Sequence, residues 1–267
     1  MSSSATTVTT TAAKEPEDVL KLFPNVSTKL LCSVAASHAH HDGDLSGYDE
    51  EQIRLMDETC LVIDQNDNPI GGASKKTCHL MENIDAGLLH RAFSVFLFDS
   101  DNRLMLQRRA AEKITFPDMW TNTCCSHPLV PAEVGTTFDD AIHGTKRAAQ
   151  RKLGHELGIV PAQVPLQDFR FLTRIYYKAP SSGKWGEHEI DYILFIKADV
   201  TLEPNLNEVQ DTRSVSQAEL KEMMSDPTVK LTPWFRLICQ STLFEWWDRI
   251  DNGLEAYEND FDIKRMS

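Results

Sequence analysis

The chain is predicted to fold as a mixed α/β domain, on three observations. Short strand-like apolar runs come first, one long amphipathic helix lies near the middle, and further strands and helices follow it. This succession is typical of a sheet covered by helices. The chain has 267 residues, of which 41% are hydrophobic, so it is long and apolar enough to bury a substantial core.

The region between residues 57 and 98 is predicted to be strand-like. The apolar run at 60–63 is followed by the turn-rich segment 64–68 and by residues 69–71, which indicates a hairpin. The run at 92–98 has the composition of a buried strand. Residues 99–102 are rich in turn-forming side chains and lead into 104–106, which predicts a second hairpin.

The central helix is predicted over residues 139–157. Ile142, Ala149 and Leu153 fall on one stripe, and Gly158 is a natural stop. Strands are expected at 169–178 and 190–198, on either side of a turn at 180–183. Helices are expected at 216–224 and 233–250, and the aromatic side chains of the last helix are expected to pack in the core, apart from Trp234.

Composition excludes several classes of function. Acidic residues outnumber basic ones 40 to 27, and a net charge of −13 argues against a nucleic-acid partner. No apolar run approaches the roughly 20 residues that a membrane span needs, and none near the first residue resembles a secretory signal. Six cysteines are too few for a disulfide scaffold, which indicates a reducing compartment, with the cytoplasm as the expected location. Nothing in the sequence fixes the oligomeric state.

The N-terminal end is predicted to be a disordered tail covering residues 1–15. Residues 2–13 are almost all Ser, Thr and Ala, so they bury too little apolar surface to offset the entropy of ordering. This segment has no arginine, unlike a mitochondrial transit peptide, and residues 264–267 match no targeting signal. Residues 16–267 are expected to form a single domain with its core at about 57–250.

A set of histidines and glutamates forms the first candidate site. Glu187 and Glu189 lie two apart on a predicted strand and so share a face, while His188 points away. Imidazole combined with carboxylate suits Zn²⁺ or Mn²⁺. From spacing alone, the alternative is that the histidines are ordinary hydrogen-bonded polar residues. The candidate histidines are His79, His90 and His127.

The segment 121–128 is the second candidate, since it is small, polar and rich in reactive groups. Pro128 after His127 predicts a fixed extended loop. Cys124 and Cys125 are adjacent and could bridge only with strain, so no disulfide is expected between them. A thiol near a metal or a cation has a lowered pKa and can act as a base or nucleophile. The alternative is that both cysteines are small buried hydrophobes.

Residues 151–159 resemble the end of the Nudix signature, Arg-Glu-U-x-Glu-Glu-x-Gly-U, where U is bulky and apolar. Lys152 and His155 replace two of its acids, and His143 and Thr137 replace the upstream acid and glycine. A working Nudix box clusters carboxylates around Mg²⁺ at a diphosphate. The resemblance therefore implies a Nudix-like α/β/α sandwich with a mixed sheet and lost hydrolysis, and a Nudix diphosphohydrolase remains the alternative function. The matching positions are Arg151, Leu153, Glu156, Gly158 and Ile159.

Six further segments resemble one family, the type I isopentenyl-diphosphate Δ-isomerases of eukaryotic type. This resemblance covers roughly residues 57–250, and the motifs at 121–128 and 185–192 are its most specific parts. It implies interconversion of isopentenyl and dimethylallyl diphosphate through a tertiary carbocation, in isoprenoid and sterol biosynthesis. The segments are 75–80, 90–94, 113–117, 121–128, 185–192 and 231–235.

The resemblance also implies a role for each candidate residue. Cys125 and Glu189 are the acid and the base, and which of them protonates the substrate is left open. Tyr177 assists Glu189 by hydrogen bonding. Trp234 faces the carbocation, because an indole attracts positive charge without reacting. Glu156 holds the Mg²⁺ that arrives with the diphosphate. One Zn²⁺ or Mn²⁺ is held by His79, His90, His127, Glu187 and Glu189. The diphosphate-binding residues are Lys75, Arg109, Lys113, Ser126 and Lys152.

Overall fold

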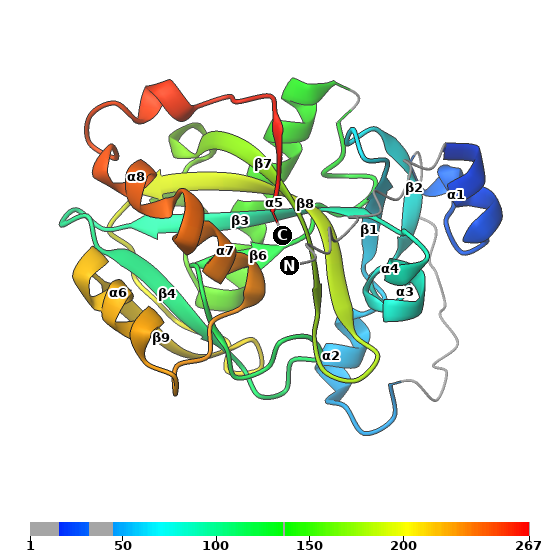
Figure 1. Cartoon of the computed structure of the whole chain (residues 1–267), viewed down its shortest axis with the longest axis horizontal. Coiled ribbons are helices and arrows are strands. Elements are labelled where there is room, and N and C mark those ends of the chain that lie inside the picture. The colour runs from blue at the N-terminus through cyan, green and yellow to red at the C-terminus, as the bar shows by residue number, and fades with distance from the viewer. Residues whose placement is uncertain (1–15, 32–44, 136, 267) are drawn as a thin grey trace, which may run out of the picture.

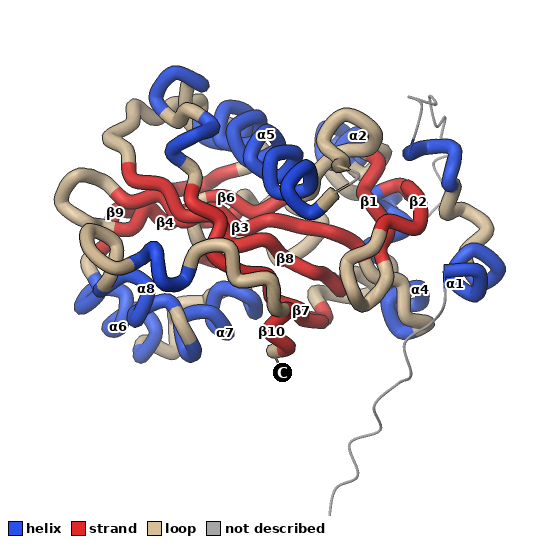
Figure 2. The backbone as a smooth tube through the Cα atoms, turned by 90° about the horizontal axis from the view of Figure 1, so that it is seen from above, coloured by secondary structure: helices blue, strands red, loops and turns tan. Residues whose placement is uncertain are grey.

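A mixed sheet lies between two groups of helices (Figures 1 and 2). The computed structural model describes residues 16–31, 45–135 and 137–266, and the predicted tail at 1–15 lies outside these ranges. Helix α5 (Phe138–Leu157) covers one face of the sheet. Helices α6 (Gln217–Ser225), α7 (Pro233–Ser241) and α8 (Leu243–Asp248) cover the other. This is the α/β/α sandwich predicted from the sequence.

Six strands run across the sheet in the order β10, β7, β8, β3, β1, β2, and four more join it beside β3 and β4. Strands β3 and β8 are parallel and almost wholly buried, as expected for strands covered on both faces. The bounds along that path are β10 (Ile263–Arg265), β7 (Arg170–Pro180), β8 (Gly186–Lys197), β3 (His90–Phe98), β1 (Thr59–Ile63) and β2 (Pro69–Ser74). The others are β4 (Leu104–Arg109), β5 (Trp120–Thr121), β6 (Cys124–Ser126) and β9 (Val209–Val215).

The first predicted hairpin is confirmed, because β1 and β2 pair antiparallel. The second is only half right. The Asp99 carboxylate accepts the amides of Asp101 and Arg103 and forms the predicted turn. Beyond it, β3 and β4 share a single pair, Phe98 with Leu104, because β4 turns away to pair with β5 and β9.

Two other sequence predictions are wrong in detail. The region 57–98 contains two short helices, α3 (Lys75–His79) and α4 (Met81–Asp85), because the Ser74 hydroxyl caps the amide of Thr77 and starts a helix. The helix predicted over 233–250 is two helices, which break at Thr242, where φ is −129°. The Ser241 hydroxyl bonds the Leu237 carbonyl just before this break and competes with the helical pattern.

The central helix is confirmed as α5. Thr137 and Asp140 form a reciprocal capping box at its start. Gly158 ends it in the left-handed conformation, at φ 68°, which a glycine adopts without steric cost. The 20-residue helix buries Ala149 and Leu153 against the sheet, as the predicted stripe required.

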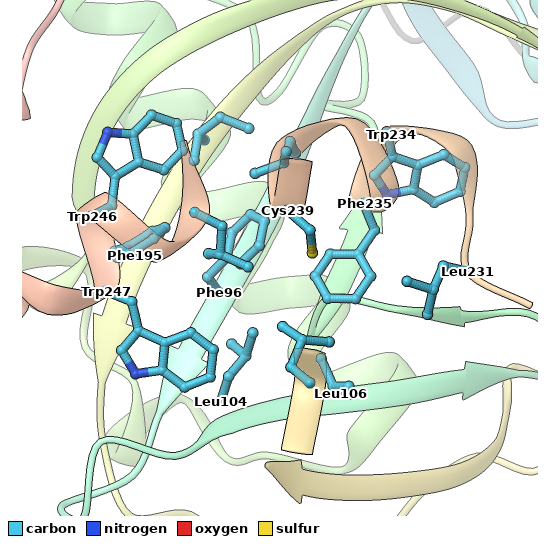
Figure 3. Close-up of a cluster of buried hydrophobic side chains, with 14 of the residues drawn as sticks. Phe96, Leu104, Leu106, Phe195, Leu231, Trp234, Phe235, Cys239, Trp246 and Trp247 are labelled. Carbon is cyan, nitrogen blue, oxygen red and sulfur yellow. The ribbon is translucent and has the colours of Figure 1, made fainter. Parts of the chain in front are cut away.

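Each face of the sheet has its own apolar core. The core under α7 and α8 is rich in aromatic side chains (Figure 3). Trp246 and Trp247 pack there against Phe195 and Phe98, with ring centroids 5.9 and 5.1 Å apart, so their predicted packing role is confirmed. Trp234 lies at the other end of this cluster, near Leu231 (Figure 3).

The N-terminal segments add two smaller clusters. Val19, Phe23 and Val26, in and after α1 (Pro16–Leu22), pack against β1 and β2. Leu45 and Met56 flank α2 (Glu50–Leu55) and join a cluster beside the 185–189 strand end. In the described ranges no helix is both long and apolar enough to cross a membrane. The short 3₁₀ helices are η1 (Thr28–Leu31), η3 (Pro161–Gln163), η4 (Leu166–Asp168) and η5 (Leu254–Tyr257).

Candidate active site

Strand register at the centre of the sheet brings the candidate residues together. The parallel pairing of β3 with β8 sets His90 opposite Glu189. The antiparallel pairing of β7 with β8 sets Tyr177 opposite Glu189. Strand β6 pairs with the other side of β3 and sets Cys125 opposite Ser94. One central strand therefore links the histidine cluster to the cysteine segment.

The first half of the site is a buried cluster of three histidines and one carboxylate. One ligand atom from each of His79, His90, His127 and Glu189 lies within 4.8 Å of all the others. Oε1 of Glu189 is 3.0 Å from Nε2 of His90 and 2.9 Å from Nε2 of His127. Nδ1 of His79 is 2.8 Å from the Lys75 carbonyl, which fixes the ring and leaves Nε2 without a hydrogen-bond partner among the described residues.

These residues fit a divalent metal ion. Burial, with the neighbouring imidazoles of His90 and His127, lowers the pKa of His79 well below its usual value, so this ring is neutral and has a free lone pair. Burial would raise the pKa of Glu189, but hydrogen bonds from His127 and His90 outweigh it and hold the pKa well below its usual range. Imidazole nitrogens that converge with an ionised carboxylate are the ligand types that a zinc-like ion binds.

Glu187 lies beside this cluster but outside the set of converging ligand atoms. Its carboxylate accepts a hydrogen bond from the Tyr177 hydroxyl at 2.9 Å, and the same hydroxyl is 2.5 Å from Glu189. Burial, with the nearby Glu189 charge, raises the pKa of Glu187 to about 8. His188 faces the other way, toward the Leu88 carbonyl and the Tyr176 hydroxyl, as strand alternation predicted.

The second half of the site is the Cys125 thiol. The extended loop predicted for this segment is only partly right: residues 124–126 form strand β6, whose backbone pairs with β3, while residues 127 and 128 lie outside any helix or strand. Sγ of Cys125 is 3.0 Å from Oδ1 of Asn122 and 3.2 Å from the indole nitrogen of Trp234. Burial, with the nearby Asp191 carboxyl, raises the pKa of the Cys125 thiol to about 12, so it carries its proton at neutral pH. Cys124 is wholly buried in the core under α5.

The third part is a group of buried cations, each held by an acid or a carbonyl. Nζ of Lys113 is 2.5 Å from Glu208, and Nζ of Lys152 is 3.2 Å from Glu156 and 3.7 Å from Glu208. Burial would lower the pKa of Lys152, but these two carboxylates outweigh it and raise the pKa. The Arg109 guanidinium donates to the carbonyls of residues 115 and 116 and lies over the Trp234 ring.

One cavity joins the three parts. Its walls include every candidate residue except His90, which is buried behind them. The thiol of Cys125, the Tyr177–Glu189 pair and the indole of Trp234 line it together with the basic residues. The candidate residues at this cavity are Lys75, His79, Arg109, Lys113, Cys125, Ser126, His127, Lys152, Glu156, Tyr177, Glu187, Glu189 and Trp234.

Sequence reasoning missed several residues that hold this site in place. Glu208 pairs with two of the buried lysines and is held in turn by the side-chain amide of Gln52, 2.9 Å away. Asp191 accepts the Ser94 hydroxyl at 2.7 Å, directly beneath the thiol segment. Asn122 contacts the thiol itself. Only the Asp191 position carried a signal, since it continues the alternation of Glu187 and Glu189 along β8.

The fold and the helix that carries Glu156 define a class of protein. Residues 88–235, more than half of the chain, match the NUDIX domain, so the chain is a Nudix protein. It is 61% identical over 264 residues to an isopentenyl-diphosphate delta-isomerase of Gibberella zeae, covering 98% of this chain and 100% of that one.

Two further relatives carry the same name. The protein of Aspergillus fumigatus is 60% identical over 277 residues, which is 98% of this chain and 99% of that one. The protein of Mus musculus is 52% identical over 224 residues, which is 83% of this chain and 97% of that one. The chain belongs to the eukaryotic type I isopentenyl-diphosphate Δ-isomerase family.

Proposed function

We propose that this enzyme interconverts isopentenyl and dimethylallyl diphosphate, adding a proton at one carbon of the allyl unit and removing one from another. The observation that carries the proposal is the shared cavity of Cys125 and the Tyr177–Glu189 pair. An unactivated alkene is a very weak base, and its protonation yields a tertiary carbocation that water would trap. The reaction therefore needs two proton carriers facing one dry pocket.

Cys125 and Glu189 suit the roles of the two proton carriers because they reach the cavity from different strands, β6 and β8. The thiol holds its proton at neutral pH, so it enters the cycle as an S–H group. The Tyr177 hydroxyl holds the Glu189 oxygen at the point where a proton is exchanged. When the reaction runs in reverse, the group that gave a proton takes it back at the same carbon.

Metal ions complete the proposed site. His79, His90, His127 and Glu189 would hold Zn²⁺ or Mn²⁺, with Glu187 alongside, and the ion would keep Glu189 oriented and lower the pKa of its carboxyl. Glu156 would hold a Mg²⁺ that neutralises part of the diphosphate charge. Lys75, Arg109, Lys113 and Lys152, with Ser126, form the cationic end that binds the diphosphate away from the reacting carbons.

The local charges explain why a protein of net charge −13 can bind an anion. The basic residues lie on the walls of one cavity, and together with a Mg²⁺ ion at Glu156 they would supply local positive charge that outweighs the distant surface acids. Binding energy from the diphosphate then positions the reacting carbons between Cys125 and Glu189. Because the thiol must stay reduced to carry a proton, we place the enzyme in the cytoplasm, on the route to isoprenoids that include sterols.

A diphosphohydrolase is the weaker candidate, because Lys152 occupies a place where the hydrolase box has a metal-binding acid. Its ammonium group puts a positive charge 3.2 Å from Glu156 where the hydrolase box has a negative one, which leaves less negative charge for a catalytic metal cluster. We expect purified enzyme given isopentenyl diphosphate to form dimethylallyl diphosphate without release of phosphate or pyrophosphate. Phosphate release without the allylic product would overturn the proposal in favour of the hydrolase.

Removal of the metal is expected to inactivate the enzyme and to lower its thermal stability. Without an ion, the buried ligand atoms lose their shared partner, and Nε2 of His79 has no hydrogen-bond partner among the described residues. An ion present at 1,000 times its Kd contributes about 4 kcal/mol to the free energy of unfolding. The measurement is turnover and melting temperature before and after chelation, and again after Zn²⁺ or Mn²⁺ is restored. Full activity in a sample proven free of metal would contradict the site.

Replacing Trp234 with phenylalanine is expected to lower kcat about tenfold. The phenyl ring attracts the cation less than indole does and lacks the N–H that lies 3.2 Å from Sγ of Cys125, and a combined loss of about 1–2 kcal/mol corresponds to roughly 5- to 30-fold in rate. Trp246→Phe is the matched control, because Trp246 packs only in the core (Figure 3) and should affect stability more than kcat. A Trp234→Phe enzyme as fast as the unmodified one would dismiss the cation-facing role.

A further inference from the structure

Asn122 lies between β5 and β6, two residues before Cys124, and its side chain is wholly buried. Its amide nitrogen donates to the Val95 carbonyl at 3.0 Å and to the Cys124 carbonyl at 3.1 Å. A backbone carbonyl can only accept, so these two bonds fix which end of the amide is which. The oxygen, Oδ1, must therefore face the opposite way, toward the cavity wall.

That single oxygen gathers donors from three elements of the fold. It lies 3.0 Å from Sγ of Cys125, 3.1 Å from the indole nitrogen of Trp234 and 3.0 Å from the Thr121 hydroxyl. The Thr121 hydroxyl is itself 2.8 Å from the hydroxyl of Thr232, at the start of α7. The indole N–H is shared, since it is also 3.2 Å from Sγ. Oδ1 of Asn122 thus holds the thiol of Cys125 and the indole of Trp234 next to each other.

We propose that Asn122 is a positioning residue of the isomerase, which fixes the thiol of Cys125 and the indole of Trp234 in one arrangement. The proposal rests on the proposed function, because it matters only if these two side chains face the substrate. Asn122 is not among the residues that line the cavity, so it would act only through the groups that it holds.

The physical need for such a residue follows from the cysteine side chain. A cysteine has three staggered positions about its first side-chain torsion, and each sends sulfur in a different direction. The other neighbours of Sγ are the hydroxyls of Thr121 and Ser94, at the longer distances of 3.6 and 3.8 Å. Asn122 offers the nearest acceptor, and loss of this anchor lets the thiol leave the geometry that proton transfer requires.

The direct test is Asn122→Ala, assayed with saturating and with limiting substrate. We expect kcat to fall about 10- to 100-fold and KM to stay within about twofold, because the diphosphate is bound by the basic residues, none of which Asn122 contacts. Thr123→Val is the matched control. Thr123 is as deeply buried in the same segment, and its hydroxyl bonds only the backbone of Leu97 and Met105, so kcat should be retained.

A purely structural role for Asn122 predicts another pattern. With a purely structural role, Asn122→Ala and Thr123→Val would both have a lower melting temperature, and kcat per folded molecule would be unchanged in both. That result would overturn the proposal. A double variant with Trp234→Phe adds a check. If Asn122 acts partly through the indole, the two losses in kcat are less than multiplicative, whereas independent effects would multiply.

A second measurement needs no Asn122 variant and no turnover. The infrared difference spectrum between the unmodified protein and Cys125→Ala isolates the S–H stretching band of Cys125. We expect this band at a lower wavenumber than that of ethanethiol in carbon tetrachloride, because the proton is held by the Asn122 oxygen. A band at the free position would overturn the proposal even in an active isomerase, whereas absence of isomerisation by the unmodified enzyme would instead overturn the proposed function.

Discussion

Cys125→Ala is expected to abolish turnover, with a loss of about 10⁴-fold, while the protein keeps its fold and its metal. The size follows from removing one of two proton carriers, since a positioned general acid or base contributes up to about 10⁴-fold. Alanine fits the same space, and the neighbouring Asn122 and Trp234 remain bonded to each other. The measurement is the rate of dimethylallyl diphosphate formation, together with circular dichroism and metal content.

Cys124→Ala is the control for this result. Cys124 is the adjacent thiol, wholly buried in the core on the α5 side, and its loss should lower stability while most of the turnover remains. If Cys125→Ala kept a substantial fraction of its rate, Cys125 would be removed from the essential pair. If both variants lost turnover equally, a general disturbance of the segment would explain the effect.

Glu189→Gln is the second change with a large expected effect, a loss of turnover of about 10³-fold or more together with weaker metal binding. The amide cannot carry the proton, and it removes the only ionised carboxylate within the cluster of converging ligand atoms. It also replaces the charged acceptor 2.5 Å from the Tyr177 hydroxyl with a neutral amide, which binds that hydroxyl less strongly. Turnover and the metal content after dialysis against a mild chelator measure the two effects separately.

His188→Gln provides the comparison on the same strand. His188 is as buried as its neighbours but faces away from the cluster, toward the Leu88 carbonyl and Tyr176. Its replacement is expected to lower the melting temperature with metal content and kcat nearly unchanged. A Glu189→Gln enzyme that kept both its metal and its rate would refute the role given to this carboxylate.

The regular parts of the fold were predictable from local patterns. The alternation along residues 187–189 correctly put two carboxylates on one side and His188 on the other, and the stop at Gly158 marked the end of α5. The break between α7 and α8 was not predictable in this way. The helical spacing of apolar residues continues across Thr242, and the side-chain bond from Ser241 to the Leu237 carbonyl that accompanies the break has no signature in that spacing.

The residues of the site were harder to predict from local sequence patterns, because they come together only through the tertiary fold. Three histidines at positions 79, 90 and 127 have no common spacing. His90 and His127 meet Glu189 because β3 pairs with β8 while β6 pairs with β3, and His79 reaches them from α3, which packs against β8. The family resemblance supplied this set. Neither local patterns nor the family resemblance identified Glu208, since it is 95 residues away from Lys113 in the sequence and is not among the residues that line the cavity.

The central claim is that two separate groups exchange protons with one substrate, and the most direct test is turnover of isopentenyl diphosphate in D₂O. The account predicts that dimethylallyl diphosphate forms with deuterium in the methyl group derived from the terminal alkene carbon, because the proton delivered there comes from a group that equilibrates with solvent. Dimethylallyl diphosphate that forms at the full rate and contains no deuterium would contradict it, because one proton would then have moved within the substrate.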